Sequence, residues 1–217
     1  MSTSHLMRGS IYLVLAIGLG CASVPGPRLR EGADYGRDDR GAWVRGPWEL
    51  IRPSAEVDEV IDQLCPAVMQ LPGARGHDDG VEYCGLLYVG MDGRYYASTP
   101  SRLAAKGQAA SSSTKTCVIP ARVIDPSGSR MIEADFHGHP WPWSGLTSGF
   151  DTASRYQRYS IRIQFDTTCH VLKLVPHVNE PVPAEIFERV GLTWRLLRVI
   201  PVWNKESGKI DPPFEVP

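Results

Sequence analysis

The chain has 217 residues, of which 42% are hydrophobic and 22% are charged, and its formal net charge is −1. This length and composition fit one folded domain with an ordinary core, together with a tail and a signal. A net charge so close to zero provides no overall field that would attract nucleic acid or an anionic membrane face, so no nucleic-acid partner is expected.

The N-terminus has the pattern of an export signal. Arg8 precedes an uncharged apolar run over residues 11–19, and small residues follow it. The run is too short for a membrane-spanning helix, which needs about 20 residues, but it fits the apolar region of a signal peptide. Cys21 after this run resembles the lipidation site of bacterial lipoproteins, although Gly18 stands where that pattern prefers Leu. Residues 1–21 therefore predict a signal with lipidation at Cys21; an ordinary secretory signal or an uncleaved anchor is the alternative.

Export implies a protein of the bacterial cell envelope, held on a membrane by its lipid at the periplasmic or surface face. Such a compartment is oxidising, so cysteines there form disulfides. Four cysteines follow Cys21, which allow three pairings, and none of them has CxxC spacing. We favour Cys65–Cys84 with Cys117–Cys169; the alternative is that some of the four are buried thiols.

The first half of the chain predicts a stem followed by a helix. Residues 22–52 are rich in Pro, Gly, Arg and Asp without apolar periodicity, which predicts a flexible stem. Apolar residues at helical spacing then predict a helix over 57–71, with Pro66 kinking or ending its first part. We therefore expect a domain over 53–203 and a loose C-terminal tail over 204–217.

The rest of the domain predicts mainly strands. Residues 81–89 and 94–97 flank a Met-Asp-Gly turn and predict a hairpin. A short helix is expected from about Thr152, and residues 184–200 are helical at first and then ambiguous. The other predicted strands, the last two as a hairpin, span 116–124, 131–136, 160–165 and 170–175. This order predicts a mixed α/β (α+β) fold with a mainly antiparallel sheet flanked by helices.

A His-Gly-His sequence follows the strand predicted over 131–136. Residues two apart on a strand point to the same side, so the imidazoles of His137 and His139 can reach one ion. Imidazole is a good ligand for zinc, and Asp151, across the following loop, can supply an oxygen ligand. Three protein ligands leave a position for water, as in catalytic zinc sites, where the ion lowers the pKa of that water toward about 7. A neighbouring carboxylate can then take the proton.

Three segments in this order resemble the JAMM signature of the JAB/MPN metallopeptidases. They are V-E-Y-C-G-L-L-Y over 81–88, H-G-H-P over 137–140 and S-G-F-D over 148–151. The signature has a Glu before a Gly-Leu-Leu strand, an HxHP at a strand end and an S-x-x-D at the start of a helix. The resemblance covers roughly residues 57–178 and implies a diverged bacterial form of the JAB/MPN-like (cytidine deaminase-like) fold.

The resemblance also implies the cofactor Zn²⁺ and a role for each site residue. Zinc ligation falls to His137, His139 and Asp151, general base and acid catalysis to Glu82, and hydrogen bonding to the developing oxyanion to Ser148. The loop from Pro140 to Ser148 is one residue longer than usual, so Ser144 is the alternative donor. Gly138 replaces the Ser or Thr that is common in the family.

Two functions follow from these residues. The first is a zinc-dependent peptidase or isopeptidase that hydrolyses an amide bond of a peptide or protein in the cell envelope. The second is an inactive JAB-like lipoprotein that acts as a binding or scaffold module through an aromatic loop over 141–143. Taken singly, Glu82 also fits a surface charge at a strand start, and Asp151 fits a helix N-cap.

Overall fold

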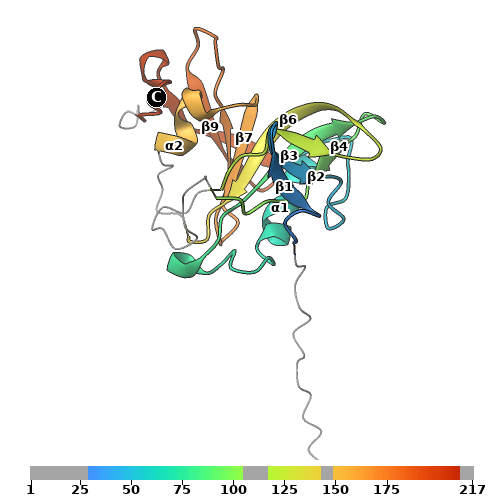
Figure 1. The fold of residues 1–217 in the computed structure, drawn as a ribbon. Helices are drawn as coiled ribbons and strands as arrows, with labels where there is room; N and C mark the ends of the chain where they lie inside the picture. The colour runs from blue at the N-terminus through green and yellow to red at the C-terminus, as the bar shows by residue number, and fades with distance from the viewer. Residues whose placement is uncertain (1–28, 105–116, 143–148, 211–217) are drawn as a thin grey trace, which may run out of the picture.

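The computed structural model describes most of the chain (Figure 1), over residues 29–104, 117–142 and 149–210. The predicted signal over 1–21, with Cys21, lies outside these ranges, as do Ser144 and Ser148. Within them, no helix is long and apolar enough to cross a membrane. The described residues form a mixed α/β structure with mostly antiparallel sheets, as the sequence predicted.

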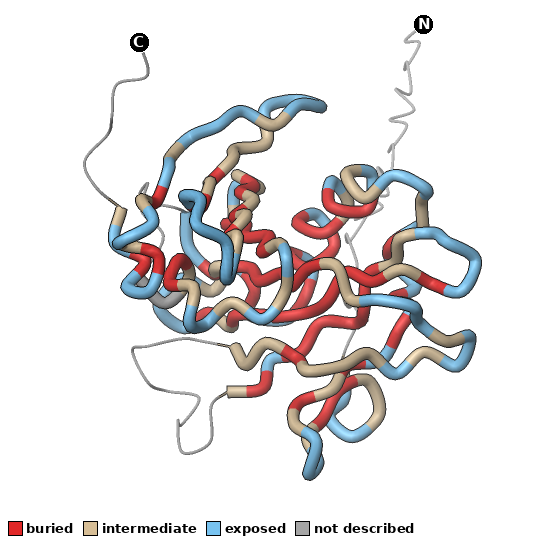
Figure 2. Tube along the Cα trace, turned by 90° about the horizontal axis from the view of Figure 1, so that it is seen from above, coloured by how far each residue is buried: buried red, intermediate tan, exposed pale blue. Residues whose placement is uncertain are grey.

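A seven-stranded sheet forms the centre of the molecule, in the order β10-β9-β8-β7-β6-β3-β4. All neighbouring strands are antiparallel except β6 and β7, which are parallel. Its strands are β3 (Tyr83–Gly90), β4 (Tyr95–Ala97), β6 (Ser129–Gly138), β7 (Ile161–Phe165), β8 (Val171–Val175), β9 (Ala184–Val190) and β10 (Thr193–Ile200). Figure 2 shows that the backbone at the centre is mostly buried, whereas the peripheral loops are exposed.

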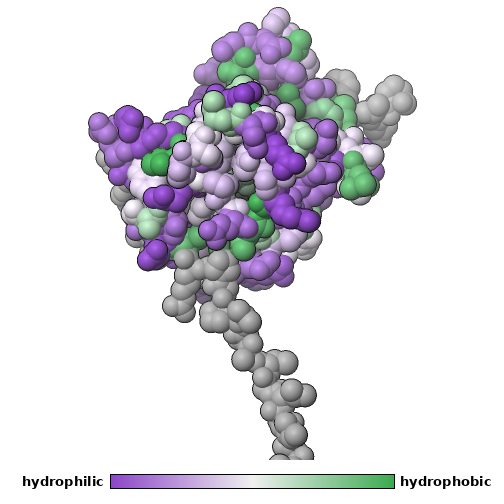
Figure 3. Space-filling view, turned by 90° about the vertical axis from the view of Figure 1, so that its right-hand side faces the viewer, coloured by the Kyte–Doolittle hydropathy of each residue, from purple (hydrophilic) through white to green (hydrophobic). Residues whose placement is uncertain are grey.

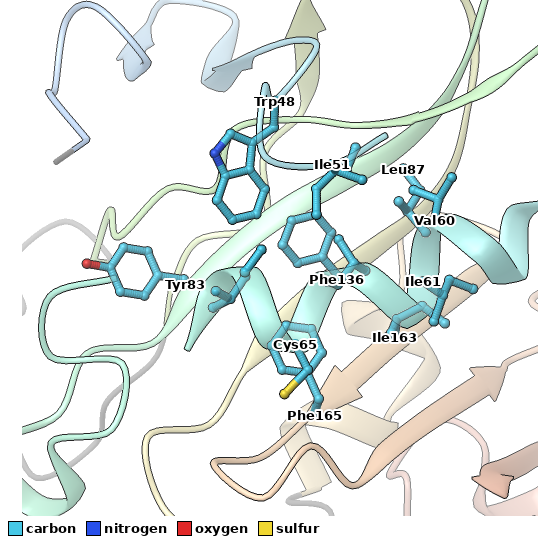
Figure 4. Packing of buried hydrophobic residues seen from close by; sticks show 14 of the residues in the cluster. Trp48, Ile51, Val60, Ile61, Cys65, Tyr83, Leu87, Phe136, Ile163 and Phe165 are labelled. Atoms are coloured by element: carbon cyan, nitrogen blue, oxygen red, sulfur yellow. The ribbon is translucent and has the colours of Figure 1, made fainter. Parts of the chain in front are cut away.

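Helix α1 (Val57–Val68) covers one face of this sheet (Figure 4). Its apolar positions are buried and contact residues from β3, β6 and β7 in the main core, among them Leu87, Phe136 and Phe165. Pro66 lies inside the helix, which continues to Val68. Pro66 therefore does not break the helix, because it stands in the final turn, two residues before the helix ends.

Gly85 shows how tightly this face is packed. A Cβ atom at residue 85 would lie 2.2 Å from Cζ of Phe136, whose ring is fully buried. We expect Gly85→Ala to lower the free energy of unfolding by about 1–3 kcal/mol, because the ring has no free space to enter. Chemical unfolding measures this loss, with Ser129→Ala at an exposed strand position as the control. An unchanged midpoint would show that the ring of Phe136 can move.

The predicted flexible stem over 22–52 is wrong for its described part. Residues of this stretch form β1 (Tyr35–Asp38) and β2 (Gly41–Arg45), which join β5 (Arg122–Ile124) in a three-stranded sheet. This small sheet packs through buried Tyr35 and Val44 against Leu86, on the face of β3 opposite α1. Tyr35, Ala42 and Val44 supply the buried apolar contacts that the absence of a longer apolar pattern had hidden. Figure 3 shows the side where this sheet and β4 lie, on which hydrophilic residues predominate.

The C-terminal part differs from the prediction in two ways. Residues 184–200 form a hairpin of β9 and β10 and no helix, since cross-strand pairing overrides their local helical pattern. Residues 204–210 are not a loose tail: Lys205 is buried, and its Nζ donates hydrogen bonds to the carbonyls of His177, Glu180 and Val182. Ile210 packs on a third apolar cluster of β8, β9 and β10.

The four cysteines form two disulfides, but the favoured pairing was wrong. The bonds are Cys65–Cys169 and Cys84–Cys117, with Cα–Cα distances of 5.5 and 5.7 Å. Cys65 lies on α1, whereas Cys84 is opposite His137 in the register and so points to the other face of the sheet. The sheet therefore separates the two cysteines that we had paired.

Candidate metal centre

The side chains of His137, His139 and Asp151 converge. One ligand atom from each of them lies within 4.8 Å of the other two, a spacing that allows all three to bind one ion. No other group of three or more His, Cys, Asp and Glu side chains with this property occurs among the described residues. The sequence thus predicted which residues meet, although the three are separated along the chain.

Strand β6 and its neighbours position the two histidines. His137 is opposite Cys84 of β3 and Gln164 of β7, so its side chain lies on the face away from α1. His139 follows the strand end, and its backbone N–H donates to the carbonyl of Phe165 at 2.8 Å. The two imidazole rings lie edge to face, with their centroids 4.9 Å apart. The alternation of the strand thus places both rings on one side, as predicted.

Gly138 between the histidines faces the main core. A Cβ atom there would lie 2.7 Å from the ring of Phe165 and 3.3 Å from the methyl group of Met69. Large apolar side chains therefore occupy the space that a Ser or Thr at residue 138 would need. This packing gives a physical reason for the glycine in this chain.

Asp151 enters the site from α2 (Gly149–Thr152), which begins the segment that crosses over the sheet. Its Oδ1 lies 3.2 Å from Nε2 of His137, and the side chain is 16% exposed. The next residue, Thr152, donates from its hydroxyl to the carbonyl of Gly208, so the C-terminal segment supports α2. The contact of Thr152 with Gly208 thus holds the backbone next to Asp151, the third candidate ligand.

Glu82 lies directly beside this group. Its Oε1 is 3.4 Å from Nδ1 of His139, and its Oε2 accepts a hydrogen bond from the backbone N–H of Cys117 at 3.3 Å. The Glu82 side chain is 8% exposed. The interpretation of Glu82 as a surface charge is therefore wrong. Its carboxylate is held by the segment at Cys117, which the Cys84–Cys117 disulfide links to β3.

The residues present fit a divalent cation. Both ring nitrogens of His137 and Nδ1 of His139 are buried, and among the described residues they make no hydrogen bond of normal geometry. Nε2 of His137 and Nδ1 of His139 have only the ion-pair contacts of 3.2 and 3.4 Å with Asp151 and Glu82. Buried polar atoms without a partner carry a free-energy cost that coordination to an ion would remove. Two imidazole nitrogens and a carboxylate oxygen are a donor set that suits zinc.

The neighbouring carboxylates change the pKa of His139. Burial alone lowers this pKa, but the interaction with Glu82 and the negative charges of Asp151 and Asp166 outweigh burial, so the pKa lies above its usual value. The same negative charges that attract a proton to this imidazole also favour a metal cation. Protons and metal therefore compete for this site, and metal affinity is expected to fall as the pH is lowered.

The wall next to the histidines contains aromatic and turn residues. The ring centroid of Trp141 lies 5.7 Å from that of His139, and Trp141 is 36% exposed. The backbone N–H of His77 in the turn η1 (His77–Asp79) donates to the carbonyl of Pro140 at 2.9 Å. His77, which the sequence analysis did not single out, thus contacts through its backbone the residue that follows His139. Trp143 lies outside the described residues.

Three buried polar residues behind the histidines were not predicted. Asp135, Arg162 and Gln164 lie on the same sheet face as His137 and are almost inaccessible. The alternation in residues 160–165 showed that Arg162 and Gln164 share a face, but such a polar face normally contacts solvent. The hydrogen bonds of Arg162 to the carbonyls of Asp151 and Tyr156 place the segment containing α2 over this part of the face.

Comparison of the chain with protein-family models, with curated proteins and with solved structures finds no match. Function is therefore inferred from the geometry of the centre and from the resemblance of its motifs.

Proposed function

We propose that this protein is a zinc-dependent hydrolase of the JAMM type that cleaves an amide bond in a peptide or protein. The observation that carries the proposal is the meeting of His137, His139 and Asp151 with the Glu82 carboxylate beside them. The order of the elements supports it: β3 begins directly after Glu82 and pairs with β6, which carries His137 and ends directly before His139. A JAB/MPN-like fold is part of the same proposal.

Each group has a role in this chemistry. A zinc ion held by the two imidazoles and Asp151 would supply a Lewis acid that lowers the pKa of water. Glu82 would take the proton of the attacking water and pass it to the leaving amine. Its burial suits this role, because a carboxylate screened from solvent has few competing hydrogen bonds. Ser148 remains the proposed donor to the oxyanion, with Ser144 as the alternative.

The cellular setting is proposed from the N-terminus and the cysteines. A lipid on Cys21 would hold the domain on a membrane of the bacterial envelope. Two disulfides joining distant segments support an oxidising compartment, where such bonds persist. The substrate is then a peptide or protein of the envelope.

Glu82→Gln separates metal binding from catalysis. The amide keeps the size of the side chain and can still accept from Cys117, but it cannot take a proton. We expect zinc content by mass spectrometry to stay unchanged, and the cleavage rate of a peptide library to fall by about 10²–10⁴-fold. Glu188→Gln is the matched control, because Glu188 also contacts a histidine, His170, at 2.6 Å, but belongs to the β8–β9 surface.

The outcome distinguishes the two functions weighed from the sequence. Wild-type protein that binds zinc and cleaves no member of the library would reject the hydrolase and favour the binding module. Equal cleavage rates in Glu82→Gln and wild type would reject the role of Glu82.

A further inference from the structure

A buried ion pair lies behind the metal centre. Arg162 donates from Nε to Oδ1 of Asp135 at 2.7 Å and from Nη2 to Oδ2 at 3.3 Å. The side chains are 4% and 0% exposed. The two residues are partners in the parallel pairing of β6 and β7, which presents the carboxylate to the planar guanidinium fork. Removing two charges from water is costly, so burial of such a pair is weak evidence for a stabilising purpose alone.

The guanidinium also reaches the segment above it. Nη1 donates to the backbone carbonyl of Asp151 at 3.2 Å, and Nη2 donates to that of Tyr156 at 3.1 Å. The Asp151 carbonyl accepts a second hydrogen bond from Nε2 of Gln157 at 2.8 Å. Arg162 thus connects the sheet to both ends of the stretch that runs from α2 through η2 (Ser154–Tyr156).

This connection joins the strand that carries His137 to the backbone of Asp151. Asp135 lies two residues before His137 on the same face of β6, so one strand carries both a ligand and the anchor of Arg162. Arg162 then holds the backbone of Asp151, whose carboxylate lies 3.2 Å from His137. Helix α2 has only four residues and is too short to hold an orientation by itself.

We propose that Arg162 is a positioning residue, oriented by Asp135, that holds the Asp151 carboxylate in place for metal binding. This inference rests on the proposed function only in that the three ligands bind a divalent cation. Lysine at residue 162 would keep one positive charge beside Asp135, but it lacks the fork that reaches two carbonyls at once.

The test uses Co²⁺ and Zn²⁺ as probes on the full chain with its disulfides intact. We expect Arg162→Lys to weaken binding of both ions by about 10–100-fold, as for other residues that orient metal ligands. Its visible Co²⁺ absorption should shift toward that of Asp151→Ala, since the carboxylate leaves the ion. Arg189→Lys is the matched control: Arg189 pairs with Asp58 and Asp62 of α1, on the other face, and its loss should change neither quantity.

A second variant covers the case in which Arg162→Lys does not fold. The double change Asp135→Leu with Arg162→Met removes both charges at similar volume, which is often neutral for stability. It too should lose affinity and show the altered spectrum. Wild-type affinity and spectrum in the folded variants would overturn the inference while leaving the metal centre in place. Failure of the wild-type protein to bind either ion would instead overturn the proposed function.

Discussion

His137→Ala is expected to abolish stoichiometric zinc binding. His137 contributes a buried imidazole whose nitrogens make no hydrogen bond with the described residues, and its Nε2 lies 3.2 Å from the Asp151 carboxylate. Loss of a residue that merely orients a ligand costs about 10–100-fold in affinity, so loss of the ligand itself should exceed that. Metal content of the purified domain and competition with a chromophoric chelator measure the effect. Asp151→Ala should also abolish stoichiometric zinc binding, and Asp151 is less buried than His137.

His170→Ala is the matched control for this experiment. His170 is another partly buried histidine that interacts with a carboxylate, Glu188, but it does not belong to the metal group. Its replacement should leave one zinc ion per chain. Circular dichroism and the unfolding midpoint show whether each variant is folded. Stoichiometric zinc in the double variant His137→Ala with His139→Ala would exclude the site.

The second large effect concerns stability. The Cys65–Cys169 disulfide closes a loop with a sequence separation of 104 residues, and it joins α1 to the turn between β7 and β8. In the chain-entropy model, a disulfide stabilises the fold because it restricts the unfolded chain, and a loop of 100 residues contributes about 4.7 kcal/mol in this way. Removing the bond gives that entropy back to the unfolded state. We therefore expect Cys65→Ala with Cys169→Ala to lower the free energy of unfolding by about 4 kcal/mol. Guanidinium unfolding of both proteins measures the difference.

The Cys84–Cys117 bond provides the comparison. Its separation is 33 residues, for which the same model gives about 3.7 kcal/mol before any strain is counted, so its removal should cost about 1 kcal/mol less than the model gives for the longer loop. It should also disturb the site, because Cys117 donates its N–H to Glu82. A larger stability loss for this pair than for Cys65–Cys169 would contradict the loop-length argument. Peptide mapping under non-reducing conditions tests the pairing itself.

The sequence by itself determined the local elements and the main candidates of the site. Apolar, β-forming runs between turns predicted the strands around β3, β6 and β8, and alternation predicted β7, because such patterns are local to each segment. The HxH spacing placed His137 and His139 on one side for the same reason. Asp151 and Glu82 came from the resemblance of short motifs, and the structure brings both to the histidines.

Only the tertiary structure decided which segments pair, which cysteines bond and which polar residues are buried, because each of these depends on a distant segment of the chain. In the described part of the stretch over 22–52, β1 and β2 form where they can pack on the far face of β3. Residues 184–200 become a hairpin because β8 offers an edge. The cysteine partners follow from the face of the sheet on which each stands. Asp135 and Arg162 are buried where the segment that contains Asp151 and Tyr156 lies against them. Local pattern fixes which way a side chain points, whereas burial and partnership depend on segments brought there by folding.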